Sequence, residues 1–317
     1  MAAMSADALL AKITEHLDRN GPTVGIDLVV VTKQEVLTLA PLLGTTLGVY
    51  RNALDTSYLR IDPRAPGGAR ISPSFLRKFI SFTLFGLDES AVDAATTRLA
   101  QHHREISARK MGLAVELCRE VFPPFIDALG GDIGVLICGD VVYNLAHDSR
   151  RREFSTGIPV RGSDIDLVIL IEEGDVPLRP EIERALLNRK YLWLKHPGIN
   201  EELDFIVKTP SEIEKQLGFE TTKDRIAAKI LAESRPLWGL GEMIARCERI
   251  IDASGVRARL AEMERTARAR QQKLERQIYS GTISHLDQED RSIFYSTELN
   301  ELGEFSGSRK ALLQINP

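Results

Sequence analysis

The chain has 317 residues, more than one hydrophobic core usually serves, so we expect more than one domain. Hydrophobic residues make up 43% and charged residues 27% of the sequence, which is ordinary for globular proteins. The sequence contains no run of about eighteen apolar residues, the length needed to span a bilayer. The formal charge of −4 argues against indiscriminate binding of polyanions. Composition therefore predicts a globular protein that does not bind membranes.

The cysteines and the N-terminal segment bear on the cellular compartment. Cys118, Cys138 and Cys247 are widely spaced, which predicts neither a disulfide framework nor a zinc site. Residues 1–20 lack the basic start and the small-residue cleavage site of a signal peptide, and their apolar spacing is that of an amphipathic helix. We therefore expect a cytoplasmic protein.

The N-terminal third has the pattern of an α/β region. Residues 5–19 predict a helix, and the nearly continuous apolar run of residues 23–32 predicts a buried strand. Two helices are expected next, over residues 71–86 and 88–122. We place a domain boundary near residue 110.

The middle of the chain begins with a strand, a turn and a helix. Residues 134–140 (GVLICGD) form a short apolar run ending in Gly139-Asp140, and residues 141–150 continue with helical spacing. Residues 150–163 are basic and contain Gly and Pro, which predicts a mobile surface loop.

Two aspartates then stand directly before an apolar run. Asp164 and Asp166 are one residue apart in the stretch VRGSDIDLVILIE, so on a strand both side chains point to the same face, roughly 6.5 to 7 Å apart. The residues that follow are apolar on both faces, so we expect the acids at the exposed start of a buried strand. Two carboxylates facing the same way repel each other, and a divalent cation between them relieves that repulsion.

A third acid belongs to a second predicted strand, residues 201–209 (EELDFIVKT). Leu203, Phe205 and Val207 share one face of this strand, and Asp204 lies on the other. Because neighbouring strands lie about 4.8 Å apart, we expect Asp204 to reach the same cation as Asp164 and Asp166.

The order of these features resembles that of the polymerase-beta-type nucleotidyltransferase superfamily: an apolar strand, a glycine turn and a helix, followed by two acids at the beginning of the next strand. The resemblance covers roughly residues 132–240 and includes the helix and "LxG" ending of residues 223–239. It implies an α/β (α+β) fold in which a small mixed-sheet nucleotidyltransferase core is flanked by helices.

The corresponding domain organisation has three parts. Residues 1–110 would be an N-terminal α/β extension of unknown role, residues 111–240 the nucleotidyltransferase core and residues 241–317 a C-terminal helical region. The N-terminal and C-terminal parts lie outside the resemblance.

The resemblance also implies a mechanism and a set of residues. Asp164, Asp166 and Asp204 would be catalytic and would hold Mg²⁺ or Mn²⁺, with Asp204 as third ligand or as general base toward an acceptor hydroxyl. The enzyme would move a nucleoside monophosphate from an NTP, such as ATP, to that hydroxyl and release pyrophosphate. The nucleotide-binding residues would be Gly139, Asp140, Ser163 and Arg161.

Two departures from the family pattern leave alternatives open. The family turn usually presents Gly-Gly or Gly-Ser to the triphosphate, whereas this chain has an acid at Asp140, and the segment between Gly139 and Asp164 is longer than usual and rich in arginine. A catalytically silent nucleotide-binding or regulatory module therefore remains an alternative, as does a partner in a toxin or defence pair. The NTP base, the acceptor (a small molecule, RNA or protein) and the oligomeric state stay open.

The C-terminal region contains a predicted amphipathic helix. Residues 256–278 carry apolar side chains at steps of three and four, and from Val256 to Arg276 there are seven Lys or Arg against three Glu. The basic face of this helix would be solvated, or would contact RNA, another anionic acceptor or a partner helix.

Overall fold

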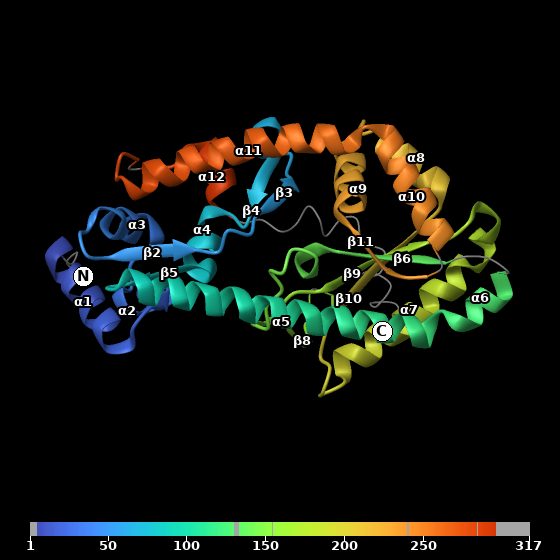
Figure 1. The fold of residues 1–317 in the computed structure, drawn as a ribbon, viewed down its shortest axis with the longest axis horizontal. Coiled ribbons are helices and arrows are strands. Elements are labelled where there is room, and N and C mark those ends of the chain that lie inside the picture. The colour runs from blue at the N-terminus through green and yellow to red at the C-terminus, as the bar shows by residue number, and fades with distance from the viewer. Residues whose placement is uncertain (1–4, 130–132, 154, 240, 284, 296–317) are drawn as a thin grey trace. The chain divides into compact units, whose positions relative to one another are not determined.

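The computed structural model describes residues 5–129, 133–153, 155–239, 241–283 and 285–295 (Figure 1). The described parts of residues 1–102 and 262–297 form one compact unit, called unit 1, and those of residues 103–261 form a second, unit 2. Each unit combines helices with small sheets, so the fold is α+β, as expected from the sequence. Among the described residues, no helix is both long and apolar enough to cross a membrane.

Unit 1 contains two small antiparallel sheets and several helices. Its elements are α1 (Ala6–Asn20), β1 (Thr23–Val24), α2 (Gly25–Thr32), α3 (Val36–Thr45), β2 (Tyr50–Ala53), β3 (Tyr58–Ile61), β4 (Ala69–Ser72), α4 (Phe75–Arg77), a π-turn (Lys78–Phe82), β5 (Thr83–Gly86) and α12 (Gln288–Phe294). One sheet has the order β1-β5-β2, and β3 pairs with β4. The long helices α5 (Glu89–Val121) and α11 (Val256–Tyr279) contribute residues to both units.

The helices predicted over residues 5–19, 88–122 and 256–278 are confirmed, but the strand predicted over residues 23–32 is wrong. Only Thr23–Val24 is a strand, and α2 follows. Its buried residues include Leu28 and Thr32, four positions apart, whereas Ile26 and Val30 are exposed. A short apolar run has no periodicity that separates a strand from a helix, so packing decided the outcome.

The helix predicted over residues 71–86 is also wrong, because this stretch passes through β4, α4, the π-turn and β5. Phe75 of α4 and Phe79 of the π-turn enter the core of unit 1, where the Phe79 and Phe85 ring centroids lie 5.1 Å apart. Leu274 and Ile278 of α11 join the same core. The proline near the start and the glycine at the end of this stretch therefore do not mark the ends of one helix, and its aromatic side chains fill a core built from several short elements.

Unit 2 is organised around one four-stranded mixed sheet with the order β10-β9-β6-β11, whose strands lie side by side in Figure 1. Its elements, besides parts of α5 and α11, are α6 (Pro123–Leu129), β6 (Gly134–Cys138), a 3-10 turn (Gly139–Val141), β7 (Arg150–Arg152), β8 (Pro159–Arg161), β9 (Ile165–Leu170), a 3-10 segment (Glu173–Leu178), α7 (Arg179–Lys195), β10 (Leu203–Lys208), α8 (Pro210–Leu217), α9 (Thr222–Glu233), β11 (Arg235–Trp238) and α10 (Gly241–Ser254). The strands predicted within residues 134–140 and 201–209 are confirmed, as is the one after Asp164.

The sheet of unit 2 is buried on both faces. Ile165, Leu167 and Ile169 of β9 pack in one core with Leu117 of α5 and Leu186 of α7. On the other side α9 and α10 contact β6. The central strand is therefore held rigidly along its length, and only its first residues reach the surface.

Two predictions that concern the segment between β6 and β9 are wrong. The helix expected after Gly139 is a single 3-10 turn, Gly139–Val141, in which the Val142 N–H donates to the Gly139 carbonyl at 3.0 Å. The basic loop expected over residues 150–163 is a hairpin of β7 and β8, anchored by Val160 against Leu194. Val160 is buried, and the Arg151 side chain donates to the Gly162 carbonyl, so the segment is anchored although most of it is polar.

Two leucines of α7 test how much the core under the sheet contributes to stability. Leu186 is 0% exposed and Leu192 is 55% exposed. We expect Leu186→Ala to lower the free energy of unfolding by about 2–5 kcal/mol, because it removes buried contacts and leaves a cavity, whereas Leu192→Ala should change it by less than about 0.5 kcal/mol. Denaturant unfolding of both variants measures this, and equal losses would contradict the assigned packing.

Candidate metal centre

Three carboxylates converge at one edge of the unit 2 sheet. Asp164, Asp166 and Asp204 each offer an oxygen atom, and these atoms all lie within 4.8 Å of one another. Asp164 and Asp166 are partly exposed, whereas Asp204 is buried. The convergence expected from the sequence is therefore present.

Strand register produces this convergence. β9 and β10 run parallel with Asp166 opposite Asp204, and Asp164 directly precedes β9. The Ile165 N–H donates to the Glu202 carbonyl at 2.9 Å, which extends the pairing toward the strand starts. Because residues opposite each other on adjacent strands share a face, the two acids face the same side of the sheet.

Gly139 lies beside the carboxylates, directly after the neighbouring strand β6. β6 is antiparallel to β9 with Cys138 opposite Asp166, so the turn after β6 lies beside the carboxylates. Gly139 has a φ of 76°, and a Cβ atom placed there would lie 2.5 Å from Oδ2 of Asp166. A glycine is therefore required both for the left-handed backbone and for the space that the Asp166 carboxylate occupies.

A buried lysine holds the third acid. The Lys190 ammonium group, carried by α7, donates to Oδ1 of Asp204 at 2.6 Å, and both side chains are 0% exposed. A charge in a protein interior is tolerated when an opposite charge and hydrogen bonds accompany it. Lys190 therefore allows a carboxylate to lie beneath the exposed pair.

Glu202 is a fourth carboxylate in this group, and the sequence reasoning missed it. Its side chain is buried, Oε2 accepts a hydrogen bond from Arg151 at 2.6 Å, and Oε1 has no partner within the described structure. Burial, together with the charges of Asp164 and Asp204, raises the pKa of Glu202 to about 7, while Arg151 and Lys190 act in the opposite direction. Four carboxylates therefore lie at this edge of the sheet, with Arg151 and Lys190 beside them.

Arg151 links the hairpin to the acids. Its Nη2 lies 3.7 Å from Oδ2 of Asp164, Nη1 contacts Glu202, and Nε donates to the Gly162 carbonyl at 2.5 Å. One guanidinium therefore connects the backbone just before β9 with acids that precede both strands.

A second buried lysine, Lys110 of α5, contacts the segments that directly precede β9 and β10. Its ammonium group donates to the carbonyl oxygens of Arg161 at 3.0 Å and Ser163 at 2.7 Å, and it also contacts Glu201. Burial lowers the pKa of Lys110, and the Glu201 charge opposes that shift. Because the same ammonium group contacts residues before β9 and before β10, it fixes Asp164 and Asp204 relative to each other.

The predicted nucleotide-binding residues also lie around the strand starts. The Ser163 hydroxyl donates to Oδ2 of Asp140 at 3.1 Å and accepts from the His147 N–H at 3.3 Å. Arg161 lies directly opposite Arg150 in the hairpin, and neither guanidinium pairs with a carboxylate among the described residues. The structure thus places Gly139 against the carboxylates, and holds Asp140 through Ser163.

Little in the sequence pointed to the supporting residues. The run Glu201-Glu202 directly before Leu203 was visible as extra negative charge, and its position at a strand start was the available signal. Lys110 and Lys190 sit on helices of ordinary composition, and only the fold brings them to the acids.

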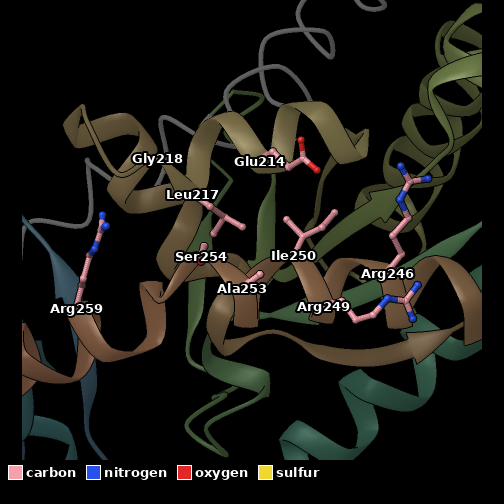
Figure 2. A pocket seen from close by; sticks show the side chains of 9 residues that line it. All are labelled: Glu214, Leu217, Gly218, Arg246, Arg249, Ile250, Ala253, Ser254 and Arg259. Atoms are coloured by element: carbon pink, nitrogen blue, oxygen red, sulfur yellow. The ribbon is translucent and has the colours of Figure 1, made fainter.

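Unit 2 also has a separate concavity of about 540 Å³ between α8, α10 and the start of α11, shown in Figure 2. Leu217, Ile250 and Ala253 form its apolar centre, while Arg249 extends to one side and Arg259 stands on the opposite side. The three aspartates are not among its lining residues.

Comparisons with known proteins do not indicate a function, so the function is inferred from the geometry of the site. No protein-family model matches the chain, and no curated protein matches it.

Two glycines with similar backbones test the fit of the carboxylate site. Gly139 and Gly157 have φ values of 76° and 69°, but a Cβ atom at Gly157 meets nothing within 4 Å. We expect Gly139→Ala to weaken Mn²⁺ binding at least about tenfold, because the new methyl group displaces Asp166, while Gly157→Ala leaves it unchanged. Calorimetric titration with Mn²⁺ measures both, and equal affinities in the two variants would contradict the site.

The buried ion pair makes a second prediction. Replacing Lys190 by Met removes the cation that contacts Asp204, so we expect a loss of about 3–5 kcal/mol in the free energy of unfolding without metal. Lys195→Met, at the exposed end of the same helix, should cost less than about 0.5 kcal/mol. Denaturant unfolding in EDTA is the measurement, and a neutral Lys190→Met would show that the pair does not support the fold.

Proposed function

We propose that the chain is a magnesium-dependent nucleotidyltransferase that transfers a nucleoside monophosphate from an NTP to a hydroxyl acceptor and releases pyrophosphate. The observation that carries the proposal is the convergence of Asp164, Asp166 and Asp204 within 4.8 Å at the start of a rigid strand. Carboxylate oxygens are the preferred protein ligands of hard divalent cations. Partial exposure of two of the three acids gives a substrate phosphate access to the same place.

The residues present fit a divalent cation. Glu202 retains a buried oxygen atom without a partner among the residues that the structure describes. Burial, and after it the charges of Asp164 and Asp204, raise the pKa of Glu202, so a bound cation would favour its charged form. Mg²⁺ or Mn²⁺ bound here would supply neutralisation of the triphosphate charge and activation of the attacking oxygen.

The chain's own residues have distinct tasks in this proposal. Asp164 and Asp166 hold the cation from the exposed side, and Asp204, fixed by Lys190, acts as the third ligand rather than as a mobile base. Arg161 lies close in sequence to these acids, and its guanidinium would bind phosphate oxygens. Arg151 would hold Asp164 and Glu202 in place during the reaction.

One observation favours a second candidate, a catalytically silent nucleotide-binding module. The turn after β6 carries Asp140, and Gly139–Val141 is only a 3-10 turn, so no long helix directs its N-terminus at a triphosphate. Ser163 holds the Asp140 carboxylate in place, which keeps the negative charge beside the proposed phosphate position. Nucleotide binding without turnover is the behaviour this candidate requires.

Pyrophosphate release separates the two candidates. Purified protein is incubated with each labelled NTP and Mg²⁺ or Mn²⁺, alone and with total RNA, a small-molecule hydroxyl mixture or denatured protein as acceptor. We expect pyrophosphate release to fall about 100-fold or more in Asp164→Asn and in Asp166→Asn, because each loses a metal ligand.

The control is Asp252→Asn, which removes an exposed acid of α10 that pairs with Arg257, and its rate should equal that of the wild type. Metal-dependent NTP binding with no pyrophosphate under any condition would favour the silent module. Equal rates in all variants would refute the carboxylates as the catalytic site.

A further inference from the structure

Unit 1 contains a pocket of its own, of about 410 Å³. It lies between the edge strand β2 and the end of α11, with Phe75 and Phe79 at its apolar base. Its volume is within the range of about 300–1,000 Å³ that is usual for small-molecule sites. All of its lining residues belong to unit 1, so the pocket is separate from the carboxylates of unit 2.

Arg51 lies along one wall of this pocket. The Arg51 guanidinium carbon lies 3.9 Å from the centroid of the Tyr279 ring, so the planar cation rests on the aromatic face. Stacking restricts the guanidinium while its N–H edge stays able to donate. Burial raises the pKa of the Tyr279 hydroxyl, so the ring stays neutral at physiological pH.

The charges around the pocket do not balance. Lys78 donates to both carboxylate oxygens of Glu275, at 3.0 and 3.1 Å, and these two charges compensate each other. Arg51 and Arg276 also line the pocket, and neither guanidinium pairs with a carboxylate within the described part of the chain. Two positive charges therefore face one small concavity.

This combination selects a class of ligand. Two guanidiniums match a phosphomonoester, which carries about −1.5 to −2 charges at pH 7, better than a single carboxylate, and arginine binds phosphate with parallel N–H bonds. Ala53, Tyr279 and the side-chain stem of Lys78, which are partly exposed, give a planar ring an apolar surface above the buried Phe75 and Phe79.

We propose that the pocket between β2 and α11 binds an aromatic phosphomonoester, with Arg51 and Arg276 holding the phosphate and the partly exposed Ala53, Lys78 stem and Tyr279 contacting the planar group. This site is a second ligand site, independent of the proposed transferase chemistry. It gives unit 1 a binding function of its own.

Calorimetric titration of the full chain with phenyl phosphate tests the proposal. The titration is done in EDTA, so that metal-dependent binding at the unit 2 carboxylates does not contribute. Inorganic phosphate, benzoate and phenol are titrated in parallel, and we expect each to bind at least tenfold more weakly than phenyl phosphate. Asp164→Asn should bind phenyl phosphate like the wild type, which separates this result from the fate of the transferase proposal.

The double variant Arg51→Gln/Arg276→Gln should lose at least tenfold in affinity. The matched control is Arg249→Gln, which changes an arginine beside the other concavity in unit 2 and should bind like the wild type (Figure 2). Unchanged circular dichroism shows that each variant is folded. Absence of saturable wild-type binding, unchanged affinity in the folded double variant or an equal loss in Arg249→Gln would overturn the proposal.

Discussion

Mutual repulsion among carboxylates is the constraint on which the arrangement of unit 2 depends. Asp164, Asp166 and Asp204 have oxygens within 4.8 Å of one another, and Glu202 is buried beside them. Such a group favours separation of the two strands that carry it, so the surrounding fold must oppose that tendency. Burial first, and the charges of Asp164 and Asp204 after it, raise the pKa of Glu202.

Three basic side chains oppose the separation, each from a different element. Lys190 binds Asp204 from α7, Arg151 binds Glu202 from the hairpin, and Lys110 of α5 binds backbone carbonyls before β9 together with Glu201. A buried ion pair is weak support for stability by itself, since desolvation offsets much of the attraction. Here the ion pairs hold the carboxylates in place, because these contacts fix which oxygen atoms face the open edge of the sheet.

The sequence predicted those parts of the site whose positions follow from a pattern of neighbouring residues. Alternation along β9 and β10 placed Asp166 and Asp204 on one face, and the apolar run after the acids indicated a buried strand. Lys110 lies 53 residues from Ser163, and no local pattern relates two positions so far apart. The α2 error had a different origin, since a short apolar run fits either a strand or a helix, and only the burial of Leu28 and Thr32, four positions apart, shows the helix.

Gly139 shows how a single position can serve fold and chemistry at once. Its left-handed backbone turns the chain sharply at the end of β6, and its missing side chain leaves room for the Asp166 carboxylate. A larger residue would force either the turn or the aspartate to move, and both lie on the central pair of the sheet. The turn therefore has at Gly139 the residue that the carboxylate geometry requires, although the acid Asp140 follows it directly. The space that the Asp166 carboxylate occupies accounts for the glycine, whichever of the two candidate functions the site performs.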